Sequence, residues 1–257
     1  MAASNFHTHS TFCDGKDSVE ELVAKAIELG SGEIGFSSHS YVPFDDDYCL
    51  SPEKEKEYIE TVLALKEKYR GKINIYLGIE QDYYSPLPEY DYDYMIGSVH
   101  YVKKDGVYIP VDNQKERLVR GVERYYGGDY YAMVKDYYEN VADIYNKTGC
   151  NIIGHFDIVT KYNRAGDLFD TNDQRYVCAY EKALAKLSSC DCAFEINTRG
   201  SASAQMRRNF PEEKIEKKIR ALGAPIVYSS DCHNKEFLLF GIPEGYDNLS
   251  NIPRIKR

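Results

Sequence analysis

Five stretches of the chain place apolar residues on one helical face, between residues that start and stop helices. The clearest begins at Ser18, which forms a capping box with Glu21, and ends at Gly30. The apolar residues within it recur with a period of 3.6 and form a stripe that must pack on another element. The other four predicted helices span 51–71, 129–149, 171–187 and 211–222.

Short apolar runs alternate with these helices and predict seven β-strands. They lie at 5–6, 33–38, 73–80, 94–99, 151–154, 193–197 and 225–230. Parallel neighbours need a crossover helix, so the alternation favours a parallel α/β fold. No repeat, low-complexity block or linker interrupts the pattern, and we therefore expect a single domain over residues 1–257. A closed β/α barrel fits this length best, and an open doubly wound sheet is the alternative.

The composition excludes several classes of function. The 257 residues include 32 basic and 41 acidic side chains, a formal net charge of −9. Nucleic acid is not an expected partner, because sequence-independent binding needs a basic surface. No run of about 18 apolar residues and no signal-peptide pattern occurs, so we expect a cytoplasmic protein without a membrane partner. The seven cysteines are odd in number and form no CxxC pair, which predicts reduced thiols.

All six histidines fall at or just beyond the C-terminal end of a predicted strand, as do two acidic residues. The set is His7, His9, His39, Glu80, His100, His155, Asp231 and His233. In a parallel barrel these strand ends meet on one face. Residues two apart on a strand point the same way, so His7 and His9 can bind one ion. Imidazoles mixed with carboxylates favour Zn, Fe or Mn over Ca or Mg. The sequence therefore predicts a metal site at the C-terminal strand ends.

The order of these residues and their neighbours resembles that of the polymerase-and-histidinol-phosphatase (PHP) superfamily. The motifs are FHTHSTFCDG (6–15), SSHS (37–40), GIEQDY (78–83), GSVH (97–100), GHFD (154–157), EINTRG (195–200) and SSDCHN (229–234). The first motif and EINTRG are similar to those of the stand-alone histidinol-phosphate phosphatases. The resemblance runs from residue 6 to residue 234, with all motifs in the family order.

The resemblance implies three divalent ions on a distorted, TIM-like (β/α)7 barrel. It assigns the first ion to His7, His9, Glu80 and Asp231, the second to Glu80, His100 and His155, and the third to Asp14, His39 and His233. Some relatives have histidine at the position of Asp14, whose carboxylate can still bind a metal. The first set would be catalytic. Two ions about 3.5–4 Å apart would activate a water as hydroxide and clamp an in-line displacement. No histidine remains to serve as a separate base.

The implied reaction is hydrolysis of L-histidinol phosphate to L-histidinol and phosphate, a step of histidine biosynthesis. A phosphate dianion needs cationic donors, and the guanidinium fork of arginine suits it. Arg164 and Arg199 lie in predicted loops after strand ends and are the first candidates for phosphate ligands, followed by Lys161 and Arg207. The alternative for each is a solvated surface charge. The acidic and aromatic segment 41–48 either lines the rim of the site or forms a solvated loop.

Two other functions fit the sequence. The first is a PHP phosphoesterase of different specificity, toward protein-tyrosine phosphate or nucleotides, which comparable turnover of all these substrates would favour. The second is a metal-binding regulatory or partner-binding module without catalysis, which would show no phosphate release after metal addition. The complete ligand set argues against the second. The sequence leaves open the choice among zinc, iron and manganese, and the oligomeric state.

Overall fold

The computed structural model describes residues 3–163, 166–202 and 208–256, and a six-stranded parallel sheet of order β1-β2-β3-β6-β7-β8 lies at its centre. The strands are β1 (Glu33–Phe36), β2 (Asn74–Asp82), β3 (Tyr94–Ser98), β6 (Ile152–Ile153), β7 (Ala193–Asn197) and β8 (Ile226–Ser229). All neighbouring pairs in this sheet are parallel, which confirms the predicted α/β class. An antiparallel hairpin of β4 (Tyr101–Lys104) and β5 (Val107–Pro110) was not predicted.

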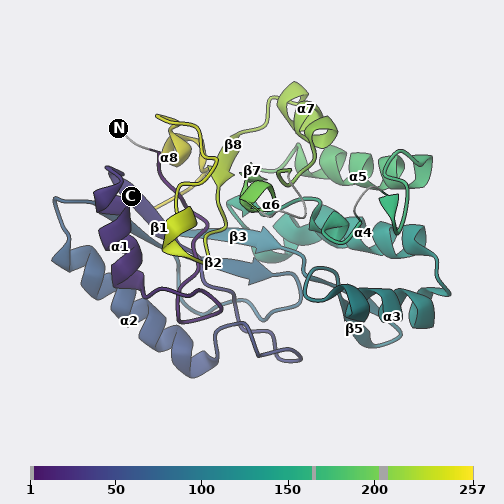
Figure 1. Cartoon of the computed structure of the whole chain (residues 1–257), viewed down its shortest axis with the longest axis horizontal. Helices are drawn as coiled ribbons and strands as arrows, with labels where there is room; N and C mark the ends of the chain where they lie inside the picture. Colours follow the sequence, from purple (N-terminus) through teal and green to yellow (C-terminus); the bar gives the residue numbers. More distant parts are fainter. Residues whose placement is uncertain (1–2, 164–165, 203–207, 257) are drawn as a thin grey trace.

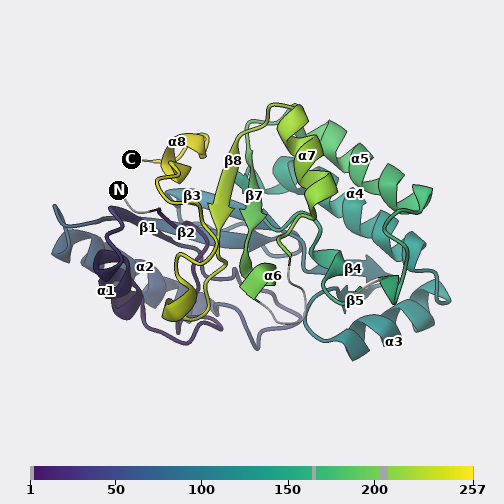
Figure 2. The same ribbon diagram turned by 45° about the horizontal axis from the view of Figure 1, so that its top comes forward.

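Helices flank the strands on two sides. In Figures 1 and 2, α1 and α2 lie on one side of the sheet, and α3, α4 and α5 lie on the other. The helices are α1 (Val19–Glu28), α2 (Pro52–Lys68), α3 (Lys115–Tyr126), α4 (Tyr130–Thr148), α5 (Gln174–Leu187), α6 (Arg199–Ala202), α7 (Glu213–Ala221) and α8 (Asn248–Asn251), with 3-10 turns at Ile158–Thr160 and Lys235–Phe237. All five predicted helices are present. Within the described residues, none of the helices combines the length and the apolar character that a membrane span requires.

The helix ends follow the local signals of the sequence. The Ser18 hydroxyl accepts the N–H of Glu21 at 3.3 Å, and the Glu21 carboxylate accepts the N–H of Ser18 at 2.9 Å, which completes the predicted capping box. Asp129 caps the first N–H groups of α4. Gly149 ends that helix with φ 68°, a left-handed conformation that glycine adopts without strain.

The alternation of side chains along the strands divides them between the helices and the interior of the curled sheet. In β2, Ile75, Leu77 and Ile79 pack against α1 and α2, whereas Tyr76 faces inward. The interior is apolar at the N-terminal ends of the strands, with Phe6, Tyr76, Tyr94, Ile96, Ile152, Ala193, Val227 and Ile252 in one cluster. Buried polar side chains follow on the same inward-facing side of four of these strands, two or more residues closer to the C-terminal ends: Glu80, Ser98, Glu195, Asn197 and Ser229. A polar layer therefore lies on an apolar plug.

The N-terminal segment lies between the two edges of this sheet. Residues 5–9 are joined by main-chain hydrogen bonds of 2.8–3.0 Å to Gly35 of β1 on one side and to Cys232, beyond β8, on the other. The strand expected here is present only as isolated bridges, because the side chain of Asn5 accepts the N–H of His7 at 3.1 Å and interrupts the ladder. The parallel sheet is thus curled into a half-barrel, consistent with a distorted TIM-like architecture.

Candidate active site

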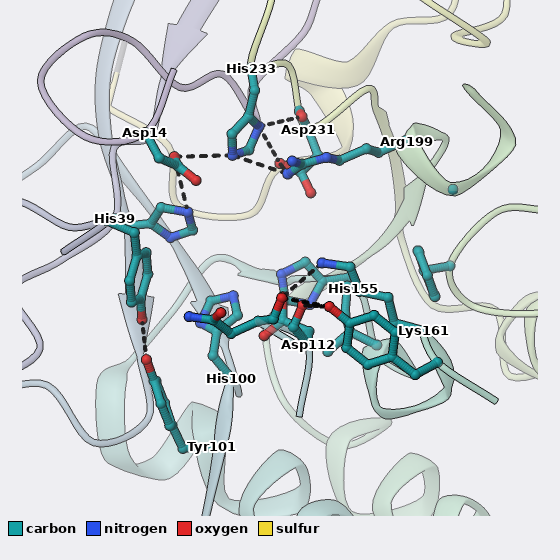
Figure 3. Close-up of a pocket in the computed structure, with 16 residues that line it drawn as sticks. Asp14, His39, His100, Tyr101, Asp112, His155, Lys161, Arg199, Asp231 and His233 are labelled. Atoms are coloured by element: carbon teal, nitrogen blue, oxygen red, sulfur yellow. Dashed lines mark hydrogen bonds and ion pairs between the residues drawn. The ribbon is translucent and has the colours of Figure 1, made fainter. Parts of the chain in front are cut away.

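A cavity of about 430 Å³ opens beyond the C-terminal ends of the strands, and the predicted metal ligands surround it (Figure 3). Six of them line its wall: Asp14, His39, His100, His155, Asp231 and His233. The other three, His7, His9 and Glu80, are buried next to these ligands. Residues from separate strand ends and from the N-terminal segment are therefore brought into one cluster.

Glu80 is at the centre of the histidines. Its Oε2 lies 2.8 Å from His39 Nδ1, 3.3 Å from His7 Nε2 and 3.5 Å from His9 Nε2, and its Oε1 lies 2.9 Å from His155 Nε2 and 3.4 Å from His100 Nε2. The prediction placed Glu80 at the end of a strand. Because β2 continues to Asp82, Glu80 instead lies inside the strand. Burial disfavours its charge, but the imidazoles, His39 first and then His7, hold the pKa of Glu80 well below its usual value.

A second group of ligands surrounds Asp14. Its Oδ1 lies 3.1 Å from His233 Nε2, 3.6 Å from His39 Nε2 and 3.8 Å from His9 Nδ1. Burial opposes ionisation of Asp14, yet His39 and His233 lower its pKa. The resemblance assigns His9 to the first ion and His39 to the third. The structure places His9 and His39 within reach of both Glu80 and Asp14, so that these two rings connect the groups.

Asp231 lies between the two groups. Its Oδ1 is 3.3 Å from both His9 Nε2 and His233 Nδ1 and 3.7 Å from His7 Nε2. The backbone of Asp231 has φ 46°, in the left-handed region that few residues other than glycine, asparagine and aspartate adopt. This strained conformation directs the carboxylate back toward the N-terminal histidines. Burial disfavours its charge, but Arg199 and His7 hold the pKa of Asp231 well below its usual value.

The residues present fit divalent metal ions. Nε2 of His7 and Nε2 of His9 are buried close together, and neither makes a hydrogen bond with any residue that the structure describes. A bound cation would satisfy these atoms. Three overlapping groups bring one ligand atom per residue within 4.8 Å of each other: His9, Asp14, His39 and His233; His7, His9 and Glu80; and His39, Glu80 and His100. Imidazole nitrogen with carboxylate oxygen suits zinc, iron and manganese.

Two carboxylates that were not predicted as site residues hold histidines from behind. Glu195 of β7 lies 2.5 Å from His7 Nδ1. Asp82 lies 3.2 Å from His100 Nδ1 and also accepts the main-chain N–H of His100 at 3.2 Å. Both carboxylates belong to the quoted motifs GIEQDY and EINTRG. The signal that could have found them is a charged residue within a strand buried on both faces, where a carboxylate needs a partner.

Two of the four predicted cationic residues line the cavity. Figure 3 shows Arg199 beside Asp231 and His233, and Lys161 on the side of Asp112. Arg199, at the start of α6, places Nη1 3.1 Å from Asp231 Oδ1 and 3.0 Å from His233 Nε2. Nζ of Lys161 lies 3.4 Å from Oδ2 of Asp112. The other two predicted residues, Arg164 and Arg207, lie outside the described residues.

Only part of the segment 41–48 reaches the cavity. Tyr48 lines it, and its ring stands edge-on to the ring of His39 with centroids 4.9 Å apart. Phe44 instead stacks on Tyr108 of β5 at 3.6 Å. The segment is therefore neither a continuous rim nor a free loop, because Phe44 packs on the hairpin that was not predicted.

Comparison with known proteins finds one matching family model and several similar sequences. Residues 5–199 match the family model described as PHP domain. A relative from Schizosaccharomyces pombe is named "Probable histidinol-phosphatase". It is 26% identical over an alignment of 257 positions, which covers 88% of this chain and 79% of the relative. Asp231 and His233 lie beyond the match to the family model, but the pairing of β8 with β7 brings them to the same cluster.

Two solved structures share the fold. HisK from Listeria monocytogenes has a TM-score of 0.79 and 24% identity, covering 93% of this chain and 98% of its own. The histidinol phosphate phosphatase HisK from Lactococcus lactis subsp. lactis, solved with zinc, L-histidinol and phosphate, has a TM-score of 0.68 and 23% identity, covering 96% of this chain and 89% of its own. The curled sheet is therefore a known architecture.

Proposed function

The chain belongs to the PHP domain family, and we propose that it is a metal-dependent phosphomonoesterase that hydrolyses L-histidinol phosphate to L-histidinol and phosphate. One observation carries the proposal: six histidines and three carboxylates converge on a single cavity that Arg199 and Lys161 also line. The name of the fission-yeast relative, and the L-histidinol and phosphate in the Lactococcus structure, support this choice of substrate.

The proposal includes three divalent ions, of zinc, iron or manganese. The nine ligands would be His7, His9, Asp14, His39, Glu80, His100, His155, Asp231 and His233. The overlap of the three ligand groups supports the close spacing of seven of them, and the contacts of His155 with Glu80 and of Asp231 with His9 support that of the other two. Such ions would supply a nucleophile from water at neutral pH and offset the charge of the phosphate. Glu80, which contacts five imidazoles, would be the shared ligand.

The proposal further treats residues 1–257 as one PHP-type domain in the cytoplasm, on a distorted (β/α)7 barrel. The main-chain hydrogen bonds of residues 5–9 to Gly35 and Cys232 support the N-terminal segment in the position of the seventh strand of that barrel. All seven cysteines are free thiols, which agrees with a reducing compartment.

The chain's own side chains would orient the substrate. Arg199 offers a planar set of donors for phosphate oxygens, and Lys161 offers a second positive charge at the same cavity. Histidinol also carries an imidazole and an ammonium group. The carboxylate of Asp112 and the ring of Tyr48, both in the cavity wall, are available to such a cationic group.

Phosphate release from three substrates tests the proposal. L-histidinol phosphate, tyrosine phosphate and a nucleoside monophosphate would be assayed separately with zinc, iron(II) and manganese. We expect kcat/KM for L-histidinol phosphate to exceed the others by at least about tenfold, since it is the only one of the three that carries an imidazole as well as an ammonium group for the wall of Asp112 and Tyr48. Equal values would refute the specific claim and favour a phosphoesterase of broader specificity. Metal binding without release of phosphate from any of them would favour a non-catalytic module.

A further inference from the structure

The carboxylate of Glu195 collects four hydrogen-bond donors beneath the cavity. Its Oε1 accepts from Nδ1 of His7 at 2.5 Å and from the hydroxyl of Ser229. Its Oε2 accepts the main-chain N–H of His155 at 2.6 Å and the side-chain amide of Asn197 at 3.2 Å. Glu195 is 1% exposed and does not line the cavity, so it lies behind the ligands and out of reach of a substrate.

The contact with His7 decides which nitrogen of that ring carries the hydrogen. An ionised carboxylate has no hydrogen to donate, so Nδ1 of His7 must be the donor in the 2.5 Å contact. In a neutral imidazole the other nitrogen, Nε2, then keeps its lone pair. That nitrogen is buried, lies 3.3 Å from Oε2 of Glu80, and has no hydrogen-bond partner among the described residues. Glu195 thereby aims a free lone pair of His7 at the predicted metal position.

The same carboxylate reaches two further ligands. It holds the main chain of His155, whose Nε2 lies 2.9 Å from Oε1 of Glu80. The amide of Asn197 donates to Glu195 and also to Oδ2 of Asp231 at 3.1 Å, which leaves Oδ1 of Asp231 for the histidines. One buried residue therefore connects ligands from the N-terminal segment, from the loop after β6 and from the loop after β8.

We propose that Glu195 is a positioning residue, which fixes His7 as the Nδ1–H tautomer and holds His155 and Asp231 in register with Glu80. This inference rests on the proposed metal-dependent function, but it concerns the assembly of the ligands and not the identity of the substrate. Outer-shell partners of this kind orient metal-binding histidines and strengthen their binding.

Glu195→Gln is the informative substitution, because it keeps the size of the side chain. A glutamine cannot accept from all four donors. With its NH₂ group toward His7, it would donate to Nδ1 and move the ring hydrogen to Nε2. With its NH₂ group toward His155, it would meet the main-chain N–H and leave that donor unpaired. Ser229→Ala is the matched control, since it removes another donor to the same Oε1 and leaves His7 and its contact in place.

Zinc affinity, measured by competition with a chromophoric chelator, is the first measurement. We expect Glu195→Gln to weaken at least one bound zinc equivalent by about 10- to 100-fold, and Ser229→Ala to stay within about threefold of wild type. The KM of active enzyme for substrate should change little, whereas kcat should fall. Zinc affinity of Glu195→Gln within threefold of wild type would overturn the proposal, as would an equal loss in Ser229→Ala.

The second measurement is the tautomer of His7 in the metal-free protein, from long-range ¹H–¹⁵N spectra of histidine-labelled samples at a pH high enough to keep the His7 ring neutral. We expect hydrogen on Nδ1 in the wild type and on Nε2, at least in part, in Glu195→Gln. Hydrogen on Nε2 in the wild type would overturn the inference whatever the substrate proves to be. Should Glu195→Gln not fold, Glu195→Asp serves in both measurements, because its shorter carboxylate must lose the 2.5 Å contact. If wild type binds none of zinc, iron(II) and manganese, the proposed function fails, while the tautomer still decides this inference.

Discussion

Removal of the divalent metal should destabilise the folded protein, because it leaves buried ligand atoms without partners. Within the described part of the chain, Nε2 of His7 and Nε2 of His9 are buried and make no hydrogen bond. An unsatisfied buried polar group costs about 1–3 kcal/mol, so two such atoms correspond to about 2–6 kcal/mol. This is the free energy that bound cations can recover on the folded side of the equilibrium.

Linkage gives a second estimate of the same quantity. A ligand that binds only the folded state stabilises it by about 4.1 kcal/mol at a free concentration of 1,000 times its Kd. This value lies within the range obtained from the buried atoms. For a domain of this size, 1 kcal/mol shifts Tm by about 2–4 °C, so chelation should lower Tm by about 8–16 °C.

Thermal unfolding followed by circular dichroism, with chelator and at rising zinc concentrations, measures this effect. Glu80→Gln is the matched control, because it preserves the size of the shared ligand and removes its charge. We expect this variant to lose most of the dependence of Tm on zinc. A wild-type Tm that moves by less than about 2 °C would refute the reasoning, and an undiminished zinc response in Glu80→Gln would place the stabilising ion elsewhere.

Three further substitutions test separate parts of the molecule. Arg199→Ala should raise the KM and the inhibition constant for phosphate by about 10- to 150-fold, the equivalent of a charged hydrogen bond of about 1.5–3 kcal/mol; an unchanged KM would remove Arg199 from the phosphate site. His9→Ala should lower kcat by at least about 100-fold with an unchanged far-ultraviolet spectrum, and near-normal turnover would contradict its role as a ligand. Hydrogen bonding from the main chain of Ser18 and from Lys235 lowers the pKa of Glu21 from 4.5 to about 2, so its stabilising effect is present above pH 4.5 and is lost as the pH falls through 2. Glu21→Gln should therefore be less stable than wild type to urea at pH 7 and equally stable near pH 2, and a deficit that persisted at pH 2 would count against this account.

The regular elements could be predicted because their signals are local. The capping box of Ser18 and the glycine after α4 mark helix ends within a few residues. The elements that were missed or altered depend on contacts distant in sequence or on one side chain. Only Leu118 and Val122 of α3 are buried, which leaves an apolar stripe too narrow to recognise. At the N-terminus, a single hydrogen bond from His7 to the side chain of Asn5 replaces a strand with bridges.

The predicted ligands could be found because strand ends converge in a parallel sheet, but how they group around each oxygen could not be predicted. His9 and His39 approach both Glu80 and Asp14, which depends on ring orientations that the spacing of residues along the chain does not specify. The cavity wall likewise depends on tertiary contacts. Tyr48 lies in it, and Phe44 of the same segment stacks on Tyr108 of a hairpin that carries no signal in the pattern of the sequence.

The carboxylates behind the ligands were not predicted, but the pattern of the strands could have identified them. In β7, the inward row passes from Ala193 to Glu195 and Asn197, and all three are at most 1% exposed. No solvent can hydrate a carboxylate at such a position, so its burial requires donors close by. Glu195 lies two residues beyond Ala193 of the apolar cluster, at the level of the first histidines, and His7 and His155 supply two of its four donors. A charged residue inside a doubly buried strand thus indicates both the presence of a site and its depth, before any ligand is identified.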